Sequence, residues 1–258
     1  MTTSTLEVAR GDGVLTLTLA RPEQLNALTD ELSDALAHEL EQAATYDDVR
    51  VVVIRGAGRA FCAGADISAV DGPMDLDVRA LDRANRIVRA ITRLDKPVLA
   101  GVRGVAAGVG CSIALACDLA VAAESASFLL AFARIGLMPD GGSTASVAAS
   151  IGRARAMRMA LLAEPLTGRE AYDAGLVSHL ADDDAFDTVV AELAAGLAAG
   201  APLALAATKR AVNAATFAGL DDALERERTG QTILLRTADA AEGMRAFAER
   251  RTPDFEGK

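Results

Sequence analysis

Two segments of this chain share one local pattern: an apolar run, then a loop of small residues, then the start of a helix. The first consists of residues 51–54 followed by residues 61–66, and the second of residues 98–102 followed by residues 104–110. An uninterrupted apolar run predicts a strand covered on both faces, which is typical of sheets packed between helices. The repetition therefore predicts an α/β core.

The other apolar patterns support this fold class. Residues 14–20 alternate Leu with Thr and predict a half-buried strand. Thr29 is expected to cap a helix whose apolar face carries Leu28, Leu32, Leu36 and Leu40. Further helices are predicted at residues 74–94 and 109–117, and further strands at residues 119–122 and, after a helix ending at Gly175, at residues 176–178.

The chain changes character at residues 200–202, where Gly, Ala and Pro follow one another. Beyond this point only amphipathic helical patterns occur, up to a charged tail. We therefore predict an α/β core over residues 1–199 and a C-terminal helical region over residues 200–258.

Charge and composition exclude several classes of function. The chain has 36 acidic against 26 basic residues, a net charge of -10, and no Trp, so neither a phosphate-binding surface nor stacking platforms for nucleobases are expected. Three cysteines without a CxxC pair and only two histidines predict no disulfide framework and no metal site. Residues 1–11 contain no apolar signal segment, and no apolar run is long enough to span a bilayer. We expect a cytoplasmic protein without nucleic-acid or membrane partners.

The two loops of small residues could bring backbone amides close to a ligand. The first amides of a helix have no intrahelical partner, and two of them directed at one carbonyl oxygen form an oxyanion hole, in which each donor contributes about 3–4 kcal/mol. Tight packing of strand on helix is an alternative, and from the residues alone it is the commoner explanation. A dinucleotide-binding fingerprint is a third possibility, although Ile113 stands where its third glycine would be.

These loops belong to a longer series of motifs. The series consists of RPEQLNAL at 21–28, FCAGADI at 61–67, GVAAGVGC at 104–111, CDL at 117–119, GLMPDGG at 136–142, TGREA at 167–171, GLV at 175–177 and ATKR at 207–210. Together and in this order, over essentially the whole chain, they resemble the crotonase (enoyl-CoA hydratase/isomerase) superfamily. The resemblance implies a spiral core of repeated ββα units and a C-terminal helical trimerisation region, assembled as a homotrimer or as a hexamer of two trimers.

The resemblance also implies the ligand and the residues that contact it. The substrate would be an acyl-CoA thioester, with coenzyme A as part of the substrate and no permanently bound cofactor. The oxyanion donors would be the backbone amides of Ala65 and Val109, the latter standing where many relatives have Gly. Arg21, Arg59 and Lys258 are candidates for the coenzyme A phosphates. Residues expected to line the substrate site are Leu25, Ala27, Ala63, Gly64, Asp66, Ile67, Gly108, Ser112 and Phe132.

The acid and base of the reaction depart from the family's hydratases. Their two glutamates fall at Ser112 and Phe132, and neither position carries a carboxylate. Asp140 instead corresponds to the acid of family isomerases, and residues 131–140 look closest to the epoxyphenylacetyl-CoA isomerase-like members. Without the resemblance, an N-cap of the following helix would be the simpler role for Asp140.

The leading hypothesis is therefore an acyl-CoA isomerase in which Asp140 moves a proton while the enolate is held by two amides. A hydratase with atypical acid and base residues and a non-catalytic coenzyme A-binding homologue are the alternatives. Covalent dehalogenase-type chemistry has less support, because the chain lacks Trp and has no His among residues 63–94.

Overall fold

A six-stranded sheet organises the chain in the computed structural model, which describes residues 5–67 and 78–258. The antiparallel pair β1 and β2 forms one edge, and the remaining strands run parallel to β2. Because parallel strands end at the same edge of a sheet, the loops that follow β3 and β4 start side by side. The strands in sheet order are β1 (Leu6–Gly11), β2 (Val14–Leu19), β3 (Val51–Gly56), β4 (Val98–Val102), β6 (Leu119–Ala123) and β9 (His179–Ala181).

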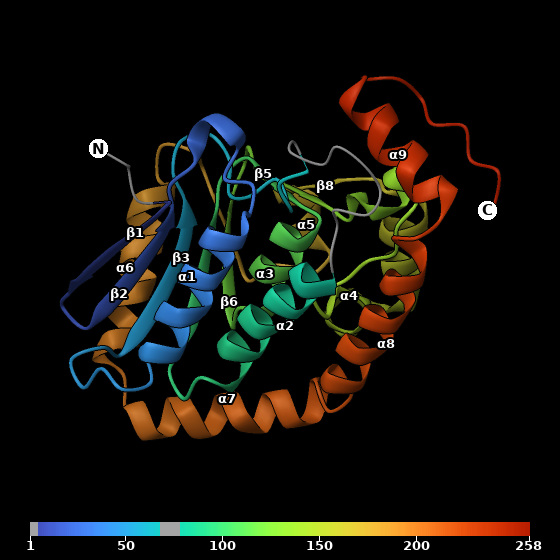
Figure 1. The fold of residues 1–258 in the computed structure, drawn as a ribbon. Coiled ribbons are helices and arrows are strands. Elements are labelled where there is room, and N and C mark those ends of the chain that lie inside the picture. Colours follow the sequence, from blue (N-terminus) through green and yellow to red (C-terminus); the bar gives the residue numbers. More distant parts are fainter. Residues whose placement is uncertain (1–4, 68–77) are drawn as a thin grey trace.

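Helices cover both faces of this sheet, as the uninterrupted apolar runs at residues 51–54 and 98–102 predict. In β3, Val51 and Val53 pack in one cluster with α6 (Phe186–Ala199), whereas Val52 and Ile54 belong to the main core on the opposite face. That core includes α1 (Asp30–Gln42), α2 (Val78–Arg93) and α3 (Val109–Ala116). Figure 1 shows α6 behind the sheet and α1 and α2 in front of it. The prediction of buried strands is confirmed.

A second sheet corrects the prediction of a loop over residues 104–110. It consists of β5 (Val105–Ala107), β7 (Ser127–Leu129) and β8 (Leu166–Thr167). Residues 105–107 are thus a strand, because β5 pairs in parallel with β7, about twenty residues further on. The pairing partner is distant in sequence, so the small residues of β5 gave no sign of it.

Most helix ends lie where the sequence predicts them. The Thr29 hydroxyl accepts the N–H of Leu32 at 3.2 Å and caps α1 as predicted. Gly175 ends α5 (Gly168–Asp173) in a left-handed conformation, but the strand predicted at residues 176–178 is wrong, since β9 begins at His179. The N–H of Leu176 donates to the carbonyl of Ala171, which keeps this segment in the helix-ending turn. Of the helix predicted at residues 74–94, residues 74–77 lie outside the described part of the chain.

The C-terminal helices fold back along the core. In Figure 1, α7 (Pro202–Thr216) runs beneath the core, α8 (Leu220–Leu234) rises beside α4 (Ser143–Leu162), and α9 (Ala238–Ala248) lies above α8. α8 contacts α2 and α4, and α9 contacts the short helix η2 (Ala131–Ile135). A second short helix, η1 (Pro22–Gln24), follows β2. No single helix of the described chain is both long and apolar enough to cross a membrane; α6 and α7 meet those criteria only as a pair bent by 108°.

Candidate active site

Backbone pairing joins the two stretches that were expected to line the coenzyme A site. The N–H of Ala63 donates to the carbonyl of Leu25 at 2.9 Å, the N–H of Leu28 to Gly64 at 2.8 Å, and the N–H of Asp66 to Leu28 at 2.9 Å. Ala27 lies within this pairing and is buried. Ile67 follows it directly, at the edge of the described chain. The structure therefore brings together the residues that the sequence placed about forty positions apart.

Two glycines bring the first small-residue loop against the start of α3. A Cβ built on Gly108 would lie 3.8 Å from the Cα of Gly64 and 3.8 Å from the ring of Phe132. Both glycines have positive φ angles, 102° at Gly64 and 52° at Gly108, which side chains disfavour. Phe132 comes from η2, so three separate segments meet at this point.

The residue after each glycine offers a backbone donor. Among the hydrogen bonds of residues 5–67 and 78–258, neither the N–H of Ala65 nor the N–H of Val109 has an acceptor. Val109 is the first residue of α3, where amides lack intrahelical partners, and Ala65 pairs with Leu28 through bonds that use the neighbouring residues. Two amides without an acceptor, on loops that approach each other, are candidate donors for an oxyanion hole.

Ser112 joins this helix to Asp140. Its hydroxyl donates to the carbonyl oxygen of Asp140 at 2.7 Å, and Ser143 donates to the same oxygen at 2.8 Å. A Cβ built on Gly141 would lie 2.9 Å from Ser112 Cβ and 3.7 Å from Val109 Cγ2. The segment that carries Asp140 therefore packs directly on the first turn of α3.

The carboxyl group of Asp140 is buried, with 7% of the residue exposed. Its Oδ2 accepts a hydrogen bond from Gln231 Nε2 at 3.1 Å, and its Oδ1 has no partner within the described chain. Burial raises the pKa of Asp140 to about 7, the Gln231 donor opposes that rise, and the nearby charge of Glu227 adds to it. Near neutral pH this group can both accept and return a proton.

The prediction that Asp140 could be the N-cap of the following helix is wrong, because the carboxylate of Glu227 accepts the N–H groups at the start of that helix. Glu227 of α8 accepts the N–H of Gly142 at 2.7 Å and the N–H of Thr144 at 3.0 Å, and it also accepts the hydroxyl of Thr144. α4 begins at Ser143, and Gly142, its N-cap, has no side chain that could cap it. Glu227 therefore caps α4 from a distant helix, and the Asp140 side chain remains available for another role.

Glu227 and Gln231 were not found by sequence reasoning. Both are 1% exposed and lie one helical turn apart on the inward face of α8, which also carries Leu220 and Leu224. The sequence does contain a signal: these two polar residues continue the apolar face of the helix. Residues on that face are expected to be buried, and a buried polar group needs a hydrogen-bond partner. The partners, in the segment around Asp140, cannot be identified from that signal.

The three basic residues predicted as candidates to bind the coenzyme A phosphates have different surroundings. Arg21 forms a partly buried ion pair with Asp66 at 2.8 Å and donates to the carbonyl of Ala27, so its guanidinium group links residues 21, 27 and 66. Lys258 pairs with Glu256 at 2.9 Å. Arg59 is exposed beside this loop. Within residues 5–67 and 78–258, no cluster of His, Cys, Asp and Glu is arranged to hold a metal ion.

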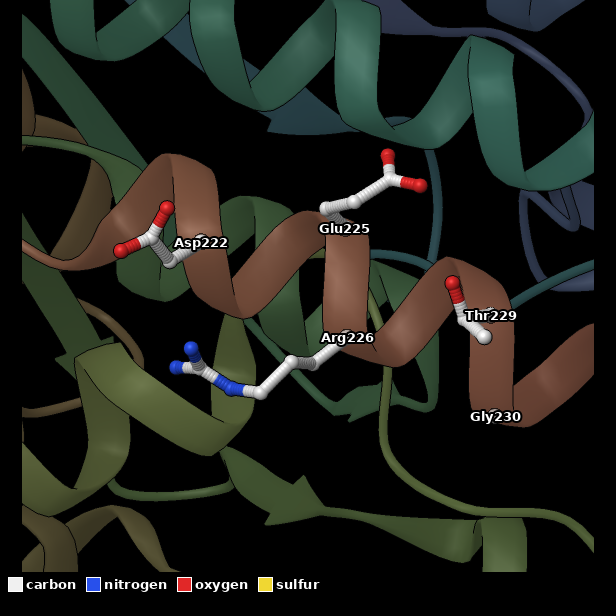
Figure 2. Close-up of a pocket in the computed structure, with 5 residues that line it drawn as sticks. All are labelled: Asp222, Glu225, Arg226, Thr229 and Gly230. Carbon is white, nitrogen blue, oxygen red and sulfur yellow. The ribbon is translucent and has the colours of Figure 1, made fainter.

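A separate pocket lies along α8, outside the predicted site. Figure 2 shows that Glu225 and Arg226, two of its lining residues, point to different sides of the helix. These charged groups do not converge on one point, and none of them was predicted to bind substrate. The pocket is lined by Asp222, Glu225, Arg226, Thr229 and Gly230.

Comparisons with known proteins identify the family of this chain. Residues 9–258 match the family described as Enoyl-CoA hydratase/isomerase. The chain is 42% identical to 1,2-epoxyphenylacetyl-CoA isomerase of Escherichia coli, over 95% of this chain and 96% of that protein. It is 40% identical to 2,3-dehydroadipyl-CoA hydratase of the same organism, over 99% and 100% of the two chains. The crystal structure of an enoyl-CoA hydratase from Mycobacterium avium subsp. paratuberculosis superposes with a TM-score of 0.92 at 49% identity and covers 98% of both chains.

Proposed function

The chain belongs to the enoyl-CoA hydratase/isomerase family, and we propose that it is an acyl-CoA isomerase with Asp140 as its proton shuttle. One observation carries the proposal: the carboxyl of Asp140 is buried, one of its oxygens has no partner within residues 5–67 and 78–258, and the backbone carbonyl of Asp140 is bonded by Ser112 to the helix that begins at Val109. The family acts on coenzyme A thioesters, whose carbonyl oxygen is the group that two free amides suit.

The proposed reaction moves a double bond from C3–C4 to C2–C3. The carboxylate of Asp140 removes a proton from C2, and the electron pair moves into a dienolate whose negative charge lies on the thioester oxygen. The amides of Ala65 and Val109 donate to that oxygen as its charge develops. The protonated Asp140 then returns the proton to C4, which forms the conjugated product and restores the carboxylate.

The environment of Asp140 supports a single-residue shuttle. A carboxyl with its pKa near 7 is partly ionised at neutral pH and accepts a proton from an activated carbon more readily than an exposed aspartate does. The 1,2-epoxyphenylacetyl-CoA isomerase among the relatives is consistent with this proposal.

Hydration is the second candidate, and it is favoured by the hydratases among the relatives. A two-glutamate mechanism has no support here, because Ser112 and Phe132 occupy those positions, and both are buried. A hydratase would therefore have to activate water through Asp140 or through a group that the site does not yet identify.

The test uses a 3-enoyl-CoA and a 2-enoyl-CoA substrate, followed by the absorbance of the conjugated thioester. We expect the 3-enoyl substrate to be converted, and Asp140→Asn to lower kcat by about 100-fold or more, in the range typical of general acid–base groups. Asp173→Asn, which changes an exposed aspartate of α5, is the matched control and should retain the wild-type kcat. Loss of absorbance from the 2-enoyl substrate, unaffected by Asp140→Asn, would favour hydration. Coenzyme A binding without turnover of either substrate would favour the non-catalytic homologue.

The assembly and location are proposed with the function. We propose a cytoplasmic homotrimer or a hexamer of two trimers, with coenzyme A present only as part of the substrate. Exposed apolar side chains on the C-terminal helices support an interface in that region: Leu203, Ile233 and Phe247 are 85%, 64% and 62% exposed. Sedimentation of the purified protein tests this proposal, and a monomer at micromolar concentration would contradict it.

A further inference from the structure

Gln231 holds both the backbone before Asp140 and the Asp140 side chain. Its Oε1 accepts the N–H of Met138 at 3.1 Å, and its Nε2 donates to the carbonyl of Met138 at 2.8 Å and to Asp140 Oδ2 at 3.1 Å. The side chain reaches these groups from α8, 91 positions further along the chain. One residue of the C-terminal region therefore fixes two points of the segment that carries the acid.

The backbone of Met138 fixes which way the amide of Gln231 faces. An N–H requires an acceptor and a carbonyl requires a donor, so Oε1 must lie against the Met138 nitrogen and Nε2 against the Met138 oxygen. A reversed amide would oppose donor to donor and acceptor to acceptor. Nε2 is consequently held where it presents a donor to Asp140, whatever the protonation state of that carboxyl.

This arrangement gives the two carboxyl oxygens of Asp140 different hydrogen-bond environments. Oδ2 is occupied by Gln231, and Oδ1 is buried without a partner in the described chain. An unpartnered acceptor in a buried position is costly unless a ligand or a water completes it. Oδ1 is therefore the oxygen whose lone pairs remain available for a proton.

We propose that Gln231 is the positioning residue of the acid: it holds Oδ2 of Asp140 and leaves Oδ1 to take and return the substrate proton. The inference rests on the proposed function, since it assigns that reaction's proton to one oxygen. It also gives the C-terminal helical region a role in the active site of its own chain.

The surroundings of Asp140 leave Gln231 as the group that stabilises its charged form. α3 presents Val109 and Ser112, which are uncharged, and Ser112 bonds the backbone carbonyl and not the carboxyl. Glu227 of α8 is the charged group whose field reaches Asp140, and it favours the protonated form. Its own carboxylate is occupied by the donors at the start of α4.

The experiment is a 13C NMR titration of the Asp140 carboxyl in the full-length protein, assigned by its absence in Asp140→Asn. In Gln231→Met, which keeps the length of the side chain but removes both polar groups, we expect the titration midpoint to rise by about one pH unit, because a donor to the carboxylate is lost. The acidic limb of the pH profile of kcat should shift to higher pH by the same amount. At neutral pH, kcat should fall by about 10- to 100-fold. Thr232→Val, which alters the neighbouring residue of α8, is the matched control and should change none of these three quantities.

A second measurement needs no substitution at residue 231. In the wild-type protein the side-chain amide resonances of Gln231 should titrate with the same midpoint as Asp140, and Asp140→Asn should abolish that titration. The role of Gln231 would be overturned if Gln231→Met kept the turnover and the Asp140 titration midpoint of the wild type. It would also be overturned if the Gln231 amide resonances of an active wild-type enzyme did not change with pH. Either result would leave the proposed function standing. Coupled titration in a protein that isomerises no thioester would overturn the proposed function and retain Gln231 as the residue that orients Asp140.

Discussion

The hydroxyl of Ser112 donates to the carbonyl oxygen of Asp140 at 2.7 Å, and this bond connects the helix of one proposed oxyanion donor to the segment of the proposed acid. Ser112→Ala should lower the free energy of unfolding by about 1 kcal/mol, the usual contribution of one hydrogen bond. We also expect kcat to fall several-fold, because the acid is no longer fixed relative to the amide of Val109. Chemical denaturation and steady-state kinetics measure the two effects.

Ser143→Ala is the informative comparison for this prediction. Ser143 donates to the same carbonyl at 2.8 Å, but it belongs to the segment of Asp140 and does not bridge to α3. A similar loss of stability with a smaller loss of kcat would support the bridge. Equal losses of kcat in both variants would show that the bonding of the carbonyl matters and the bridge does not.

Gly110→Ala should separate the two small-residue loops. An added Cβ would lie 2.6 Å from the carbonyl oxygen of Cys62 and 2.7 Å from its Cβ, so α3 must move away from the loop that carries Ala65. We expect kcat to fall at least about 10-fold, towards the 100- to 1,000-fold that loss of an oxyanion donor causes. Binding of coenzyme A, measured by calorimetry, should change much less, because the pairing of residues 25–28 with residues 63–66 is untouched.

Gly196→Ala is the matched control for that change. Gly196 is an exposed glycine of α6, and a Cβ there meets no atom within 4 Å. The variant should keep the wild-type kcat and gain about 0.5–1 kcal/mol of stability, since alanine is the better helix former. A Gly110→Ala enzyme as active as Gly196→Ala would contradict the proposed site.

The central strands β2, β3, β4 and β6 and several helix ends could be predicted because their causes are local. The apolar run of β3 and the cap at Thr29 depend on neighbouring residues, and both are confirmed. β1 was missed because only Leu6 of its six residues is buried, which leaves no alternation to detect. The hydrogen bonds of Glu227 with Gly142 and of Gln231 with Asp140 could not be predicted, because they join α8 to residues 85 and 91 positions earlier in the chain.

The stability of the protein should depend on pH through Asp140. Its pKa is about 7 in the folded protein and 3.8 as an unperturbed group, so between these values the folded state holds a proton that the unfolded state releases. Stability from this group is therefore full below about pH 4 and is lost as the pH rises through 7, by roughly 1.4 kcal/mol for each pH unit.

Asp140→Asn isolates this contribution. The free energy of unfolding of the variant, measured relative to wild type at several pH values, should increase between pH 4 and 7 and then become constant, because asparagine has no proton to lose. Denaturant titrations followed by circular dichroism, at one protein concentration, provide the values. A difference that does not vary with pH would mean that Asp140 has the pKa of an ordinary aspartate.

A buried ion pair anchors α7 to the sheet. Lys209 Nζ lies 2.7 Å from Asp118 Oδ2 and also donates to the carbonyls of Ile91 at 2.8 Å and Lys96 at 3.1 Å. Asp118 in turn accepts the N–H of Val98, at the start of β4. Burial raises the pKa of Asp118, and the charge of Lys209 opposes that rise.

Lys209→Met should therefore lower the free energy of unfolding by about 3–5 kcal/mol at pH 8, because it leaves the Asp118 carboxylate buried without its counter-charge. The loss should shrink as the pH falls, since the raised pKa lets Asp118 take up a proton in the folded state before it would in the unfolded chain. Lys209→Met combined with Asp118→Asn should recover part of the stability at pH 8, because no unpaired charge remains. A double variant that is as unstable as Lys209→Met alone would show that the lysine acts through its two carbonyl contacts and not through the ion pair.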